Sequence, residues 1–461
     1  MKPLIRLIMI ALLLSIAPTA RAADNASPAA APEASSPFWR DAKFSANLYY
    51  FQRYRDRLEK STDHYGVNLS HASSQLSLDF ESGWLGDFLG FDFGVFGAYD
   101  FYNDSAGADH EMNFVYWRDP WHPEWNSSKN KDAASVYKAL MKMKAGPLWA
   151  RAGYFQPQGP GVLGVNWSFL PGTYQGAEVG ADLGRLTLAV AWADEYKAPW
   201  YTDTYHFQKA DGRGNFQQVD YLWSLGARYQ ATERLSLEAA YGQSQSYLWN
   251  AHLKAKYELP LADGDTLRLA AHSYFINDIN GAGAMDDNVS ATALQQYLAA
   301  IYSTGPWTLN AEFTYSRAPH EQAGQVNYFA YRLVRPSGGA KGAYEPWWDL
   351  RSDWDHHQEK AVFFKAGRAL DDLGLSGVKA AVSGAYGWGG RAWGSPETFS
   401  EAALGLDLSY TVDQGPLAGA IFALHFTYYD NRTDLPSWDT FQNAFQDEHD
   451  VKFTMIIPLT K

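Results

Sequence analysis

The sequence predicts an all-β fold, a transmembrane antiparallel β-barrel of about 18 strands with short turns at one end and long loops at the other. Three observations lead to this prediction. Apolar and polar residues alternate in many segments, the connections between these segments alternate between short and long, and no stretch after the N-terminal leader approaches the roughly 18 apolar residues of a membrane helix. Aromatic residues at 16% and 39 glycines also suit a sheet with many turns.

The chain begins with a predicted export signal. Lys2 and Arg6 precede an apolar run over residues 7–17, and small residues surround a cleavage site at residues 20–22. We therefore expect residues 1–22 to be a signal peptide.

The next stretch, residues 23–41, is rich in Ala, Pro and Ser and is expected to be a flexible N-terminal tail. Residues 42–461 are then the barrel domain. Subtracting the three basic residues of the signal from 38 leaves 35 against 51 acidic residues, a net charge of -16. This charge argues against nucleic acid as a partner. With no cysteine in the chain, disulfides do not stabilise it.

Alternation of apolar and polar residues defines each predicted strand. In residues 404–410, for example, Leu and Tyr occupy every second position, and Gly, Asp and Ser the positions between them. The predicted strands are 43–54, 73–84, 91–102, 134–145, 148–156, 175–184, 186–194, 219–230, 234–244, 250–258, 266–276, 293–303, 307–317, 358–369, 376–387, 401–411, 419–430 and 450–459.

The connections indicate a membrane barrel more strongly than the strands do. Tight turns at 145–147, 184–185, 231–233 and 304–306 contrast with long stretches such as 103–133, 195–218 and 318–357. A soluble sandwich or β-helix would not need this contrast, whereas a transmembrane barrel has short turns on one side and long loops on the other. A barrel of this strand number is too wide for side chains to fill, so a polar lumen and transport are expected.

The first predicted strand carries arginines at every second position, on the face opposite Phe44, Leu48 and Tyr50. A cation facing lipid costs up to about 2–4 kcal/mol, so these arginines are expected to face the lumen. The alternative is that Arg57 lies beyond the strand in a solvated loop. Alternation adds four more inward cations, which gives a predicted basic file of Arg53, Arg55, Arg57, Lys138, Lys142, Lys144 and Arg151.

Inward carboxylates are also expected along the lumen. The predicted set is Asp79, Glu81, Asp100, Glu238 and Glu312. Basic groups in file offer successive donors to carboxylates or sugar oxygens, but opposite inward charges can also pair simply to satisfy each other.

Tryptophans in the predicted long loops are candidates for stacking against sugar rings. These are Trp117, Trp121, Trp125, Trp167, Trp347 and Trp348. An interfacial aromatic girdle is the competing explanation, and it is the better one for tryptophans at strand ends.

Catalysis and metal binding have weak support in the sequence. His356 and His357 are adjacent, with Asp349, Asp353 and Asp355 nearby, but no fixed ligand spacing is visible. We expect a solvated loop there, with no metal site, no cofactor and no catalytic residue.

Several long stretches resemble the chitoporin members of the OprD family of substrate-selective outer-membrane porins. They include GPLWARAGYFQPQG (146–159), WSFLPGTYQGAEVG (167–180), LHFTYYDNRTDLPSWD (424–439) and FQDEHDVKF (445–453). The resemblance implies a monomeric barrel of eighteen strands in the outer membrane of a Gram-negative bacterium. It also implies a channel constricted by an inward-folded loop that falls on residues 156–174.

The resemblance further implies the solute and the partners. The expected function is uptake of chitooligosaccharides, with carboxylate-bearing small solutes as the alternative and a barrel hydrolase as a weaker one. The expected partners are outer-membrane lipid, a small-molecule or oligosaccharide solute, and the assembly machinery of the outer membrane.

Overall fold

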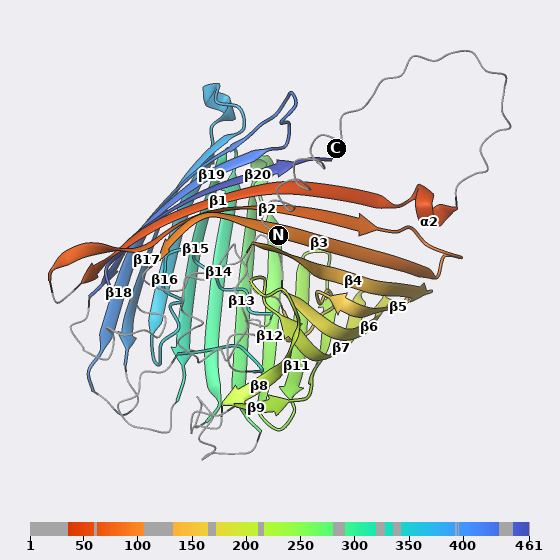
Figure 1. The fold of residues 1–461 in the computed structure, drawn as a ribbon. Helices are drawn as coiled ribbons and strands as arrows, with labels where there is room; N and C mark the ends of the chain where they lie inside the picture. Colours follow the sequence, from red (N-terminus) through yellow and green to blue (C-terminus); the bar gives the residue numbers. More distant parts are fainter. Residues whose placement is uncertain are drawn as a thin grey trace, which may run out of the picture. The chain divides into compact units, whose positions relative to one another are not determined.

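Eighteen antiparallel strands close into a barrel in the part of the chain that the structure describes, which confirms the predicted fold (Figure 1). The structure is a computed structural model. It describes residues 36–59, 62–105, 132–164, 172–210, 216–279, 291–319, 328–334, 343–391, 394, 396–432 and 446–460. The predicted signal peptide and most of the predicted tail lie outside these residues.

Most strands begin and end within a few residues of their predicted bounds. The barrel consists of β1 (Lys43–Glu59), β2 (His64–Glu81), β3 (Leu89–Ser105), β4 (Ala133–Ala145), β5 (Leu148–Phe155), β6 (Thr173–Leu183), β7 (Leu186–Lys197), β10 (Leu222–Gln230), β11 (Leu235–Ser244), β12 (Leu248–Pro260), β13 (Thr266–Asp278), β14 (Ala293–Thr304), β15 (Trp307–Arg317), β16 (Lys360–Ala369), β17 (Val378–Gly390), β18 (Phe399–Thr411), β19 (Ile421–Asn431) and β20 (Glu448–Pro458). The ring closes where β20 pairs with β1.

The remaining elements are short. Strands β8 (Tyr205–Ala210) and β9 (Phe216–Val219) pair with each other where the loop 195–218 is predicted, and β9 ends one residue beyond that loop. The helices are α2 (Pro37–Arg40) and the 3₁₀ helices η2 (Ala262–Gly264) and η3 (Asp371–Leu373). None of the helices in the described ranges is long and apolar enough to cross a membrane.

The first two strands are longer than predicted. Strand β1 continues to Glu59 rather than residue 54, and β2 begins at His64 rather than residue 73. Arg55 and Arg57 therefore lie within a paired strand, and the alternative that Arg57 sits in a solvated loop is wrong.

The two ends of the barrel differ in their connections. One end, the short-turn rim, has two-residue turns at 146–147, 184–185 and 305–306. Gly146 and Gly184 have φ values of 58° and 71°, a left-handed conformation that glycine adopts without steric cost. The opposite end, the long-loop rim, carries longer connections such as 198–221 and 318–359.

The outer wall is apolar because of the alternation within each strand. On β18, Leu404, Leu406 and Leu408 are 63%, 53% and 49% exposed, whereas Asp407 between them points inward and bonds to other lumen residues. Such a wall suits contact with lipid acyl chains.

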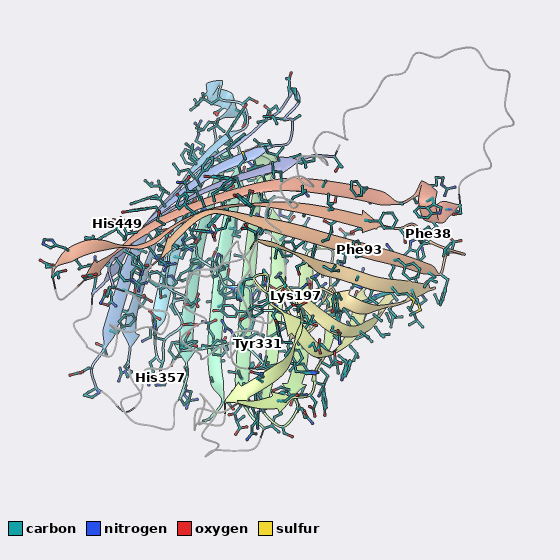
Figure 2. The ribbon with its side chains drawn as sticks, in the orientation of Figure 1. Phe38, Phe93, Lys197, Tyr331, His357 and His449 are labelled. Atoms are coloured by element: carbon teal, nitrogen blue, oxygen red, sulfur yellow. The ribbon has the colours of Figure 1, made fainter. Side chains whose placement is uncertain are left out.

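The end of the predicted tail packs against the barrel. In α2, the carbonyl of Phe38 accepts a hydrogen bond of 2.9 Å from the amide of Gly83, which follows β2. The ring of Phe38 also lies 6.5 Å from that of Phe91 on β3. In Figure 2, Phe38 marks this short-turn end, and His357 and His449 lie at the opposite end.

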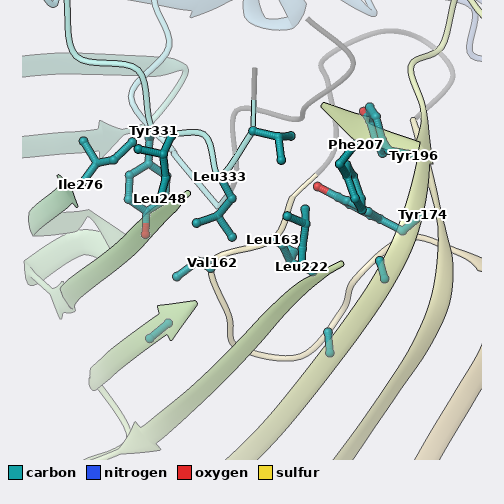
Figure 3. Packing of buried hydrophobic residues seen from close by; sticks show 14 of the residues in the cluster. Val162, Leu163, Tyr174, Tyr196, Phe207, Leu222, Leu248, Ile276, Tyr331 and Leu333 are labelled. Atoms are coloured by element: carbon teal, nitrogen blue, oxygen red, sulfur yellow. The ribbon is translucent and has the colours of Figure 1, made fainter. Parts of the chain in front are cut away.

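The largest apolar core lies inside the barrel and is built from connections as well as strands (Figure 3). Val162, Phe207 and Leu333 come from three different connections or short strands and join wall residues such as Leu222. Burying one such side chain stabilises the fold by about 1.5–3 kcal/mol. Because eighteen strands leave a wide interior, these loops fill part of it.

Candidate functional site in the barrel lumen

Residues 156–164 leave the end of β5 and cross the inner wall of the barrel. The backbone amides of Gln158 and Gly159 donate to the carboxylate of Glu178 on β6, at 3.2 and 2.8 Å. The amide of Val162 donates to the Ser224 hydroxyl on β10 at 2.8 Å. These bonds satisfy backbone groups that the wall would otherwise leave unpaired. We call residues 156–164 the first inward segment.

Two wall glycines make room for this segment. A Cβ atom at Gly226 would lie 2.3 Å from the carbonyl oxygen of Pro160, and one at Gly242 would lie 2.3 Å from Cγ2 of Val162. Real Cβ atoms do not approach other atoms so closely. Glycine inside a strand often marks a place where another backbone comes near, and here that backbone is the first inward segment.

A second inward segment, residues 343–359, lies on the inner wall and contacts strands from β12 to β20. Its amide at Ala343 donates to the carbonyl of Val162 at 3.0 Å, so the two segments are bonded to each other. Lys254 on β12 donates to the carbonyl of Ala343 at 2.7 Å. Further along, Ser352 donates to Glu401 on β18 at 2.7 Å.

The second segment contains unusual backbone conformations. Arg351, Trp354 and Gln358 have φ values of 75°, 54° and 62°, in the left-handed region that residues with side chains seldom adopt. Each costs of order 1–3 kcal/mol and persists only where the surroundings hold it. The contacts of the segment with the wall supply that support.

Between the two segments and the wall lies a cavity of about 350 Å³. Its charged lining comes from neighbouring strands and from the second segment. The lining residues are Pro157, Gly159, Gly161, Leu163, Gly164, Arg228, Ser236, Glu238, Lys254, Lys256, Ala343, Tyr344 and Glu345. We call this cavity the constriction.

The charges of the constriction are paired. Glu345 accepts from Lys254 at 2.8 Å and from Lys256 at 2.6 Å, and Glu238 pairs with Arg228 at 2.6 Å. Burial opposes ionisation of Glu345, but the two lysines outweigh it and lower the pKa of Glu345 to about 2. The constriction thus presents donors and acceptors side by side.

A second charge network lies where β19, β20 and β1 meet the second segment. Arg351 donates to Glu448 at 2.6 Å, and Lys452 donates to Asp349 at 2.5 Å. Burial opposes ionisation of Asp349, and Lys452 and His425 outweigh it and lower its pKa. The network ties the inward segment to the place where the barrel closes.

Carboxylates or other polar groups accompany most of the predicted basic residues. The contacts are Arg53 with Asp450 at 2.7 Å, Arg55 with Asn68 at 2.6 Å, Arg57 with Glu448, Lys138 with Asp79 at 3.2 Å, Lys142 with Asp92 at 2.6 Å, Arg151 with Glu178 at 2.7 Å, and Lys144 over the Trp84 ring at 4.2 Å.

These basic residues form two groups. The strand register shows how far along the barrel each group lies. From β4 to β1, Lys138 pairs with Gly94, Gly94 pairs with Asp79, and Asp79 pairs with Ser45, so Lys138 lies level with Ser45 on β1. Ser45 is eight residues from Arg53 along the same strand, which corresponds to about 26 Å. The arginines of β1 therefore lie toward the long-loop rim and the cations of β4 and β5 farther toward the short-turn rim.

The five predicted acidic residues all contact a polar or basic side chain. The partners are Lys138 for Asp79 and Glu81, His71 for Asp100, Arg228 for Glu238, and Trp348 for Glu312.

The predicted tryptophans are placed only in part. Trp117, Trp121, Trp125 and Trp167 lie outside the described residues. Trp347 is 43% exposed, whereas Trp348 is 5% exposed, stacks on Phe363 at 5.2 Å and donates to Glu312 at 2.6 Å.

The expectation of a solvated loop at the two adjacent histidines is wrong. His356 and His357 belong to the second inward segment, which packs against the barrel wall, and their side chains are therefore 0% and 1% exposed. His357 accepts a hydrogen bond of 3.0 Å from the amide of Ala318, and burial lowers the pKa of His357 to about 4.

Sequence reasoning missed several charged residues of the lumen. Asp450 and Lys452 occupy inward positions of the last predicted strand, and alternation with its apolar residues could have found them. Glu345 and Arg351 lie in a connection without periodicity, so no local signal marked them.

A closed barrel with an apolar outer wall and a charged lumen narrowed by inward segments defines an outer-membrane porin. The chain belongs to the OprD family, since residues 36–448 match the family described as outer membrane porin, OprD family. It is an outer-membrane protein, as the sequence predicts.

Individual relatives agree with this assignment. The chain is 38% identical to the chitoporin of Escherichia coli (strain K12) over an alignment of 451 residues, with 94% of this chain and 94% of that protein covered. Its fold resembles that of Pseudomonas aeruginosa OccK9 (OpdG), with a TM-score of 0.72, 16% identity, and 92% of this chain and 100% of that chain covered. The crystal structure of Pseudomonas aeruginosa OpdK with vanillate gives a TM-score of 0.69, 17% identity, and coverage of 92% and 99%.

Proposed function

We propose that this porin takes up chitooligosaccharides by facilitated diffusion through the lumen. The 38% identity to a chitoporin across nearly the whole chain supports the solute class. The observation that carries the proposal in the structure is the pairing of charges in the constriction, where Glu345 lies between Lys254 and Lys256.

Paired charges suit a neutral polar solute. Oligomers of N-acetylglucosamine carry no net charge but present hydroxyl and amide groups that both donate and accept hydrogen bonds. The lysines offer donors and the carboxylates of Glu238 and Glu345 offer acceptors within the same cavity. Passage requires binding that is favourable enough to admit a solute and weak enough to release it, which a row of exchangeable hydrogen bonds provides.

Aromatic side chains add stacking surfaces for the sugar rings in this proposal. Trp347 is the half-exposed tryptophan of the second inward segment, and Trp117, Trp121, Trp125 and Trp167 belong to the same proposed set. Each stacked ring contributes about 0.5–1.5 kcal/mol beyond burial. The more accessible of the predicted basic residues, such as Arg57 with a side chain that is 28% exposed, act with them by orienting the polar groups of the solute.

In this proposal the protein is a channel and not an enzyme. It acts as a monomer inserted by the outer-membrane assembly machinery. Solute leaves the lumen with every glycosidic bond intact.

A carboxylate-bearing solute is the second candidate, and one observation favours it. Arg228 and Lys256 have side chains that are 46% and 53% exposed, whereas those of Glu238 and Glu345 are 10% and 37% exposed. The accessible charge in the constriction is therefore more positive than its composition suggests, which would attract anions.

Single-channel recording in planar bilayers separates these candidates. Chitohexaose should produce brief, concentration-dependent blockades, and maltohexaose and small carboxylates should produce few or none. Blockade by carboxylates alone would reject the chitooligosaccharide function in favour of the second candidate. Recovery of shortened oligomers from the chamber would reject the channel-only proposal.

A further inference from the structure

Three side chains that could bind a metal ion meet where the second inward segment contacts the wall. They are His356 and Glu359 at the end of the segment and Glu401 on β18, and each is 0% exposed. Nδ1 of His356 lies 3.0 Å from Glu359 Oε2 and 3.8 Å from Glu401 Oε1. The group is separate from the constriction, because none of the three lines that cavity.

The two carboxyl groups lack sufficient hydrogen-bond donors for two negative charges. Glu401 accepts from the hydroxyls of Ser352 and Tyr429, and Glu359 accepts from the backbone and ring of His356. The ligand atoms of the two carboxyl groups and of His356 all lie within 4.8 Å of one another. Like charges so close cannot both persist in a buried site without a positive charge between them.

One carboxylate oxygen remains without a partner. Oε1 of Glu359 is fully buried and has no hydrogen-bond partner among the described residues. An unsatisfied carboxylate oxygen is costly to bury, so its retention calls for an explanation. A proton shared by the two carboxyl groups is one explanation, and a bound cation is the other.

The ligand types and their spacing favour a transition-metal ion. Zn²⁺ binds imidazole nitrogen and carboxylate oxygen at about 2.0–2.2 Å, which places the ligands of a tetrahedral site about 3.3 Å from each other. The observed 3.0 and 3.8 Å lie on either side of this value. Ca²⁺ instead requires about six to eight oxygen ligands, and imidazole is not among them.

We propose that His356, Glu359 and Glu401 bind one divalent transition-metal ion of the Zn²⁺ class, which fastens the second inward segment to the barrel wall. Ser352 and Tyr429 orient the Glu401 carboxylate as outer partners. Gly387 leaves the space that Glu359 needs, since a Cβ there would lie 2.1 Å from Oε1.

The first test measures Zn²⁺ binding by the full-length protein. Purified barrel in detergent is stripped with EDTA, dialysed and titrated with Zn²⁺ by calorimetry, and bound metal is counted by mass spectrometry. The Glu359→Gln/Glu401→Gln double variant should bind one ion fewer per chain. His356→Ala should weaken that site at least tenfold.

The matched control is Glu258→Gln on β12, an exposed carboxylate outside the site, which should bind as the unaltered protein does. Glutamine keeps the shape of the buried carboxyl groups, and two glutamines can hydrogen-bond to each other without a cation. Heat-modifiable migration of the variants in gels checks that they fold. Equal stoichiometry and affinity in the double variant would show that the pair shares a proton instead.

A second measurement does not depend on variants. Crystals of the unaltered protein soaked in Zn²⁺ should give an anomalous peak within about 2.2 Å of the three ligand groups. Data that locate Zn²⁺ only at exposed histidines, with no peak between these residues, would overturn the proposal.

Discussion

The amide of Ala343 donates a hydrogen bond of 3.0 Å to the carbonyl of Val162, and this bond joins the two segments that narrow the lumen. The first segment lies on β6, β7, β10 and β11, and the second continues from β12 toward β20. The constriction is therefore made by two connections together rather than by the first one alone. Changes in either segment should affect the solute path.

Displacing the first inward segment should change the conductance. Gly226→Ala places a methyl group 2.3 Å from the Pro160 carbonyl oxygen, so we expect the segment to leave its position on the wall. Single-channel conductance should change while the barrel stays heat-modifiable. Gly367→Ala is the control, because its methyl group would make an ordinary contact at 3.5 Å. Equal conductance in both variants would contradict the assigned position of the segment.

Shortening the same loop should widen the pore. Deleting part of residues 156–174 removes backbone from the lumen, so conductance to small ions should rise in a correctly folded variant. Unchanged conductance would mean that the second inward segment alone limits the current.

Removing the Glu345 carboxylate should shift ion selectivity toward anions. Glu345→Gln leaves Lys254 and Lys256 without their shared partner, and the reversal potential in a salt gradient should move accordingly. Glu233→Gln, an exposed change at the short-turn rim, should leave the reversal potential as it was.

The contribution of Glu345 should hardly depend on pH in the usual range. Its pKa is lowered from 4.5 to about 2, so its ionised form and the stabilising pairing persist above pH 4.5 and are lost as the pH falls through about 2. The difference in reversal potential between the unaltered protein and Glu345→Gln should be equal at pH 7 and pH 4. A difference that falls to about one quarter of its pH 7 value at pH 4 would show an ordinary pKa of 4.5.

Breaking the pair of Arg53 and Asp450 should destabilise the barrel. Their side chains are 1% and 0% exposed, and removing one partner of a buried pair costs about 3–5 kcal/mol. Urea unfolding in lipid vesicles, followed by tryptophan fluorescence, should show a larger loss for Arg53→Ala than for Arg53→Ala/Asp450→Ala. Equal losses would mean that Asp450 finds enough support from Arg351, which lies 3.7 Å away.

Substitutions of the two adjacent tryptophans should have different effects, one on stability and the other on solute binding. Trp348→Ala removes a buried ring stacked on Phe363 and should lower the free energy of unfolding by about 3–5 kcal/mol. Trp347→Ala removes a half-exposed ring and should weaken chitohexaose blockade roughly two- to tenfold with little loss of stability. Normal blockade in Trp347→Ala would assign stacking to other residues.

Local patterns in the sequence were sufficient to predict where the strands lie and which face of each strand meets lipid or the lumen. Successive side chains of a strand point to opposite sides, so the alternation in residues 404–410 sets the lipid face of β18 without reference to any other strand. The same rule placed Arg53 and Arg55 on the lumen side, and contrasting connection lengths indicated a membrane barrel. Periodicity decides these features because it depends only on neighbours in the chain.

Contacts between residues far apart in the sequence were decided by the tertiary structure alone. Arg53 meets Asp450 because the first and last strands pair at one register, and this register follows from closure of the whole ring. Glu345 enters the constriction, and His356 meets Glu401, only because a connection without periodicity folds inward over strands far away in the sequence. No local pattern encodes such contacts, since they depend on the curvature of the barrel and on the space that its wall glycines leave open.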